Sequence, residues 1–161
     1  MEQRIWATVG QLSKEAIKKI AKLTKAKSTI KRGHLVVDYE NPVWIGSEKT
    51  GQQTKYLLVA RRGDQLVQDE TEVYISNQQF QALWPMTLGF RIEKVKHSIT
   101  LDGTPVEIDV YRDTYENQAV IRVNEEDDFI LPTWLGEVQV IGTEMSCDDS
   151  WIALHGWPDI E

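Results

Sequence analysis

The sequence has 161 residues, 41% of them hydrophobic and 27% charged, which allows a hydrophobic core and argues against a disordered chain. No apolar run approaches the roughly 18 residues of a membrane span, and the first residues lack a secretory signal pattern. The single cysteine, Cys147, excludes an internal disulfide and fits a reducing compartment. We expect one domain, residues 1–161, that is cytoplasmic and has no membrane partner.

The net charge of −7 is distributed unevenly along the chain. Residues 1–32 contain nine basic and two acidic residues, a net +7, so the remaining residues carry −14. This asymmetry bears on the partners of the protein rather than on its fold. The acidic balance of the larger part opposes nucleic acid as a partner.

The first predicted elements are a strand over residues 3–9 and an amphipathic helix over residues 13–26. Ser13 is a suitable N-cap, and lysines occupy the outer face of the helix. A solvated face beside an acidic barrel is the favoured interpretation of these lysines, and binding to nucleic acid or to a membrane surface stays open. The apolar residues that recur at helical spacing are Leu12, Ala16, Ile20 and Leu23.

The middle of the chain predicts strands joined by tight turns. Asn41-Pro42 interrupts the first pair of strands, and Arg61–Asp64 has the composition of a hairpin turn. Ser76 and Gln79 form a capping-box pattern before a short helix that Pro85 ends. The strands are predicted over residues 34–39, 43–45, 55–60 and 67–75.

The last third predicts a long hairpin, a further strand and a final helix. Asp102-Gly103 is a strong two-residue hairpin signal between strands 90–101 and 104–111. A strand over 119–124, an acidic turn over 125–128 and a helix over 149–155 follow. Strands joined by turns, with a few helices, predict an antiparallel α+β domain or a barrel.

Charged residues recur two apart in several predicted strands, so each pair projects from one face of its strand. A solvated outer face is the simpler interpretation. The alternative is the interior of a wide barrel, where acidic pairs hold a divalent metal and basic pairs hold phosphate. The pairs are Glu70 and Glu72, Lys94 and Lys96, and Glu107 and Asp109.

Two segments resemble the CYTH, or triphosphate-tunnel, superfamily. A basic strand, a hairpin and an acidic strand follow one another in FRIEKVKHSITLDGTPVEIDVY, and PTWLGEVQV follows later. The late match is carried by Pro132, Trp134, Leu135, Gly136, Glu137 and Val138. The resemblance implies an α+β fold that is mainly antiparallel β, with an eight-stranded tunnel-like barrel and a few flanking helices.

The resemblance also implies a site for a triphosphate or short polyphosphate with Mg2+ or Mn2+. Family activities include hydrolysis of inorganic triphosphate and of thiamine triphosphate, and adenylate cyclase. Glu2 takes the place of one glutamate of the family's opening signature. Transferred by position, the metal ligands are Glu70, Glu72, Glu107 and Asp109, and the phosphate-binding residues are Arg4, Lys94 and Lys96.

The sequence departs from the family pattern at two places. No arginine pair occurs near residues 43–46, and Arg122 and Asn124 stand where the last acidic pair is expected. Two hypotheses follow: a metal-dependent phosphohydrolase acting on a triphosphate or short polyphosphate, and a non-catalytic binding or sensor domain with a degenerate site. The expected partner is a small phosphorylated ligand, and a homodimer stays open.

Overall fold

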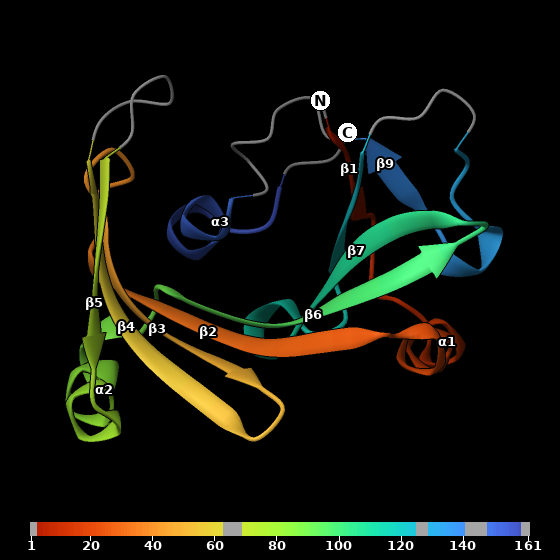
Figure 1. Cartoon of the computed structure of the whole chain (residues 1–161). Helices are drawn as coiled ribbons and strands as arrows, with labels where there is room; N and C mark the ends of the chain where they lie inside the picture. Colours follow the sequence, from red (N-terminus) through yellow and green to blue (C-terminus); the bar gives the residue numbers. More distant parts are fainter. Residues whose placement is uncertain (1–2, 63–68, 125–128, 141–147, 159–161) are drawn as a thin grey trace.

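The computed structural model describes residues 3–62, 69–124, 129–140 and 148–158. In these residues nine strands form one antiparallel sheet, in the order β5-β4-β3-β2-β6-β7-β8-β1-β9. The sheet bends into a trough whose concave side faces helix α3, Asp149–His155 (Figure 1). The predicted α+β, mainly antiparallel class is confirmed. The sheet is not closed, because β5 and β9 form its two edges.

The N-terminal segment forms β1, Gln3–Thr8, and α1, Lys14–Leu23. Ser13 caps α1 by accepting a hydrogen bond from the backbone N–H of Ala16 at 3.1 Å. Ala16 and Ile20 are buried in the core on the convex side of the sheet. The amphipathic pattern therefore directs α1 to the convex side, opposite to α3.

The next four strands are β2, Ala26–Val36, β3, Val43–Thr50, β4, Gln53–Arg62, and β5, Asp69–Ile75. The prediction placed the first of these over residues 34–39 and was wrong about its start. Residues 26–33 carry polar side chains on both faces and show no apolar alternation. They form a strand because β3 and β6 pair with them on both sides.

Helix α2, Asn77–Leu83, begins with the predicted capping box, in which Ser76 and Gln79 exchange hydrogen bonds. The 3-10 turn η1, Trp84–Thr87, follows and contains Pro85. It packs on β2 at Gly33, where an added Cβ would lie 2.4 Å from the Thr87 hydroxyl oxygen. Glycine is therefore required at this contact.

The long hairpin consists of β6, Arg91–Leu101, and β7, Thr104–Tyr111, as predicted. Asp102 and Gly103 both have positive φ, 50° and 79°, as a two-residue turn of this kind requires. The remaining elements are η2, Asp113–Tyr115, β8, Ala119–Asn124, η3, Thr133–Leu135, and β9, Val138–Val140. The predicted acidic turn 125–128 and Cys147 lie outside the described residues.

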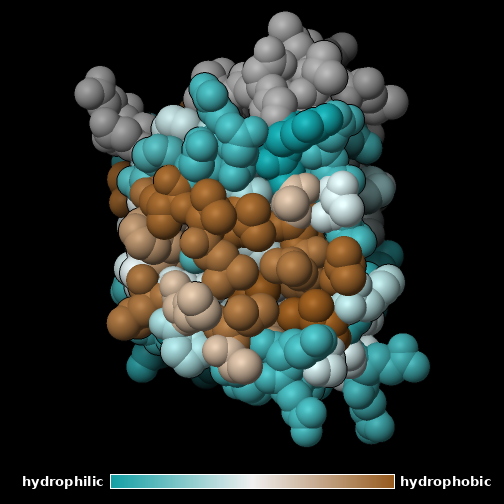
Figure 2. Space-filling model, turned by 90° about the vertical axis from the view of Figure 1, so that its left-hand side faces the viewer, coloured by the Kyte–Doolittle hydropathy of each residue, from teal (hydrophilic) through white to brown (hydrophobic). Residues whose placement is uncertain are grey.

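The outer side of the β5 arm is apolar over a broad area (Figure 2). Val73 on β5 is 52% exposed, and Met86 and Leu88 near α2 are 70% and 74% exposed. No helix among the described residues is long and apolar enough to cross a membrane.

Candidate functional site in the trough

The strand register places the charged pairs found in the sequence on one face of the sheet. Residues opposite one another on antiparallel strands project to the same side. Lys96 is opposite Asp109 on the concave side, and Glu70 is opposite Arg61 at the far arm of the same side. Arg4 is opposite Val123 in the convex core, so it projects away from Lys94. Glu2 lies outside the described residues.

A buried ionic cluster occupies the middle of the trough. The Lys94 ammonium donates to Asp109 Oδ2 at 2.8 Å and contacts Asp149 Oδ2 of α3 at 2.9 Å. Arg122 donates to the same Asp109 oxygen at 2.6 Å, and the Tyr111 hydroxyl donates to Asp149 Oδ1 at 3.0 Å. Lys94 is 5% exposed and Asp109 is 1% exposed. Strands β6 and β7 therefore hold the Asp149 carboxylate of α3 against the concave face of the sheet, and Arg122 of β8 joins the cluster through Asp109.

The electrostatics of this cluster favour its charged forms. Burial alone would raise the pKa of Asp149, but Lys94 and Arg32 outweigh it and hold that pKa well below its usual range. Burial would lower the pKa of Lys94, but Asp149 and Asp109 raise it. Burial, and then the Asp149 charge, raise the pKa of Tyr111 well above its usual value. Tyr111 is therefore a neutral hydrogen-bond donor.

The second arm of the trough holds the other polar residues of α3. Arg61 on β4 donates to Asp148 at 3.3 Å. Arg32 on β2 donates to the Ser150 hydroxyl at 3.0 Å and lies 4.0 Å from Asp149. Three consecutive residues at the start of α3 thus contact cations from both arms of the sheet.

His34 shares the Ser150 hydroxyl with Arg32, at 3.1 Å from its Nε2 atom. Burial, and then the charge of Arg32, lower the pKa of His34 to about 4. His34 is therefore neutral at pH 7, which limits the positive charge of this arm.

The acidic residues proposed as metal ligands do not converge. The Glu107 carboxylate forms an ion pair with Lys96 at 2.7 Å, and Glu70 and Glu72 are exposed on the edge strand β5. Asp109 Oδ2 is taken by Lys94 and Arg122, while its buried Oδ1 has no hydrogen-bond partner among the described residues. No three His, Cys, Asp or Glu residues within the described part of the chain could hold a metal ion together. This arrangement does not fit a preformed Mg2+ or Mn2+ site.

Several residues of the cluster were missed by the sequence analysis. Arg122 was interpreted only as a lost carboxylate, yet its guanidinium binds Asp109. Asp149 was assigned only to a short helix, because the sequence does not show where a helix docks. The register supplies the missing signal for Arg32, Arg61 and Tyr111, which project to the same side as Lys94.

Comparison with known proteins identifies relatives, although no family model matches the sequence. A curated inorganic triphosphatase of Nitrosomonas europaea is 36% identical over 92 residues, 53% of this chain and 61% of that protein. The matched region thus covers less than two thirds of the relative. A crystal structure of an inorganic triphosphatase aligns with a TM-score of 0.64 and 22% identity, over 96% of this chain and 97% of that one.

The chain has the fold of this triphosphatase structure. A second crystal structure, of a hypothetical protein, agrees with a TM-score of 0.64 and 23% identity over 95% of this chain and 97% of that one. This shared fold accounts for the trough. In this chain the cations of the floor bind carboxylates at the start of α3.

Proposed function

We propose that the trough binds the triphosphate group of inorganic triphosphate or of a short polyphosphate and hydrolyses it. The observation that carries the proposal is the set of α3 carboxylates held by cations of the sheet. Phosphate oxygens take the same charge-assisted hydrogen bonds as carboxylate oxygens. The relative named as an inorganic triphosphatase supports the choice of ligand. The cations that hold these carboxylates are Arg32, Arg61 and Lys94, and Arg122 adds a further positive charge at Asp109.

Ligand binding in this proposal competes with docking of α3. The Asp149 carboxylate touches Lys94 and Tyr111, two groups that a phosphate would need. The Asp148 carboxylate occupies Arg61 in the same way. A triphosphate with more charge than two carboxylates can displace both if the start of α3 moves out of the trough.

The chemistry proposed for the residues is positioning and charge stabilisation, which dominate catalysis of phosphoryl transfer. A water oxygen attacks a terminal phosphorus and forms a new P–O bond, the bridging P–O bond breaks, and the leaving phosphate oxygen takes the electron pair and the proton that the water loses. Asp109 Oδ1, a buried acceptor that no described residue contacts by a hydrogen bond, can orient that water by accepting its hydrogen bond. Because the carboxylates do not fit a preformed metal site, we assign no step to a metal.

The second candidate is a binding or sensor domain without catalysis on the same trough. Two observations favour it: the central cations already have carboxylate partners, and the described acidic residues do not converge. In that case the protein would signal ligand binding through the movement of α3.

The test is thermal unfolding of the whole protein with tripolyphosphate, ATP or thiamine triphosphate, each with and without Mg2+ or Mn2+. A ligand that binds only the folded state raises the melting temperature. The shift should be lost in Lys94→Ala and kept in Arg62→Ala, whose side chain is 79% exposed on another part of the sheet. Glu107→Ala tests whether the shift with metal depends on an acidic strand residue.

Measurement of phosphate release then separates the two candidates. Release that requires Lys94 identifies the hydrolase, and a shift without release identifies the sensor. The absence of any shift at millimolar ligand would overturn both candidates.

A further inference from the structure

The convex side of the sheet carries a second concentration of positive charge. On α1, Lys14, Lys18, Lys19 and Lys22 are exposed. Exposed Lys25 and Lys27 continue the series to the start of β2, and Lys31 and Lys49 follow on β2 and β3. None of these eight lysines forms an ion pair with a described residue. The ion pairs that the structure shows involve other lysines and arginines. We call this set the outer basic stripe.

The outer basic stripe is separate from the trough. On β2, Lys27 and Lys31 alternate with Arg32 and so project to the opposite side of the sheet. Lys49 is opposite Thr29, which lies between these two lysines on the same side. A ligand on the stripe therefore does not reach Lys94 through the sheet.

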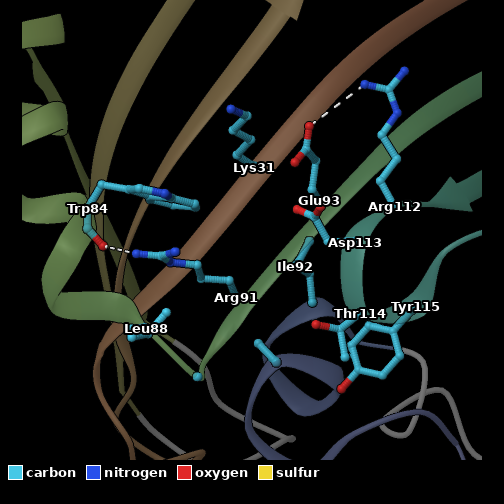
Figure 3. Close-up of a pocket in the computed structure, with 12 residues that line it drawn as sticks. Lys31, Trp84, Leu88, Arg91, Ile92, Glu93, Arg112, Asp113, Thr114 and Tyr115 are labelled. Carbon is cyan, nitrogen blue, oxygen red and sulfur yellow. Dashed lines mark hydrogen bonds and ion pairs between the residues drawn. The ribbon is translucent and has the colours of Figure 1, made fainter.

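Two hollows adjoin one another at Lys31. The larger, about 390 Å³, is lined by Lys31, Arg91 and Arg112, with Trp84 on one wall (Figure 3). It also contains two carboxylates, Asp113 and Glu93, the second of which lies 3.7 Å from Arg112. The smaller, about 200 Å³, has two lysines and no acidic residue, and its polar lining is Thr29, Lys31, Ser47, Lys49, Thr54, Tyr56 and Gln81. Ammonium and hydroxyl groups together are donors suited to phosphate oxygens.

The length of the stripe indicates an extended ligand rather than a single anion. The α1 lysines from Lys14 to Lys22 span about 12 Å at the helical rise. From Lys25 to Lys31 the chain covers a further distance of about 20 Å at the rise of a strand. Cations spaced along such a path match a linear polyanion.

The neighbouring side chains exclude two other kinds of partner. The Trp84 ring packs on Phe80 at 5.1 Å and under the Arg91 guanidinium at 4.6 Å, so it is not a free stacking platform for bases. The apolar side of α1 is already buried through Ala16 and Ile20, so it cannot insert into a membrane. Recognition on this side therefore depends on the charge and the oxygen atoms of phosphate groups.

We propose that the outer basic stripe and its two hollows bind a linear inorganic polyphosphate chain, at a site distinct from the trough. The surface is positive although the whole chain carries −7, so binding is local and depends on salt. Each lysine that neutralises a phosphate releases a counterion, which gives the affinity a measurable salt slope.

The experiment measures binding of a fluorescent long-chain polyphosphate to the whole protein at several salt concentrations. The stripe variant is Lys31→Gln with Lys49→Gln. The matched control is Lys55→Gln with Arg62→Gln, which removes two cations that have acidic partners, Glu48 and Asp69. We expect the stripe variant to lower the affinity and reduce the salt slope by about two, one for each lysine. The control should change neither.

Two further measurements decide the site and the ligand. Lys94→Met, or Arg61→Gln if the first does not fold, should keep long-chain binding. Loss of binding in the trough variant with no change in the stripe variant would overturn the inference, and the trough proposal would stand. A single-stranded oligonucleotide that displaces polyphosphate at equal phosphate concentration would overturn the assignment of the occupant. If tripolyphosphate does not bind, that result overturns only the proposal for the trough and not the one for the outer basic stripe.

Discussion

His34 shows how a buried titratable side chain connects the trough to the stability of the fold. The side chain is 1% exposed, and its ring lies between the charges of Arg32, Arg61 and Asp149. Its Nδ1 atom has no hydrogen-bond partner in the part of the chain that the structure describes. A protonated ring would add a further positive charge beside two arginines, so the folded state favours the neutral form.

We predict that His34 makes the protein less stable as the pH falls from about 6.5 to about 4. Its pKa is lowered to about 4 in the folded state, so the unfolded chain binds the extra proton in this window. The full difference between the His34 pKa of the unfolded and the folded state corresponds to about 3 kcal/mol of unfolding free energy. Urea unfolding at pH 7 and pH 4.5 should show a smaller loss of stability in His34→Gln than in the unmodified protein. Equal losses in both would contradict the prediction.

Gly33 provides a prediction about packing. Gly33→Ala should lower the unfolding free energy by about 1–3 kcal/mol, because the new Cβ would collide with Thr87 of η1. Gly10→Ala is the matched control, since a Cβ there meets nothing within 4 Å. Chemical denaturation measures both, and the prediction fails if the two variants lose the same amount.

Helix α3 determines whether the trough is accessible. Its first residues bring two carboxylates to cations of the sheet, while Ile152 and Ala153 pack with Ile5 and Val120. Docking of α3 thus combines charge pairing at one end with apolar contact along the helix.

Asp149→Asn should increase the affinity of the trough for tripolyphosphate about tenfold, equivalent to about 1.4 kcal/mol, because the variant removes a competing charge. The same change should lower stability by about 1–3 kcal/mol, because Lys94 loses one of its two buried partners. Calorimetric titration measures the affinity. Asp102→Asn, at the exposed hairpin turn, is the control. Weaker binding in Asp149→Asn would contradict competition by α3.

Local signals predicted many of the elements. The capping box at Ser76, the turn at Asp102-Gly103 and the helix over 149–155 depend on nearby residues and were confirmed. The start of β2 was missed, because its polar residues are ordered by partners distant in sequence. The i, i+2 pattern of charges was visible, but the docking of Asp149 on Lys94 joins residues 55 apart and leaves no local trace.

The sheet as a whole has a stable middle and two open edges. Strands β2 and β6 have hydrogen-bonded neighbours on both sides, whereas β5 has one neighbour and is exposed along most of its length. We predict the slowest amide hydrogen exchange in β2 and β6 and much faster exchange in β5. Exchange followed by mass spectrometry measures this, and equal protection across the sheet would contradict it.

The strand order also determines when the sheet can form during synthesis. β1 lies between β8 and β9, and its Trp6 is opposite Ile121 and Val140. The ribosome therefore releases β1 long before β8 and β9 are synthesised. Until then the backbone of β1 has neither of its two partner strands. Contacts this distant in sequence slow folding and leave an edge open to wrong pairing. A nascent chain of this protein should accordingly depend on chaperones until its last third emerges.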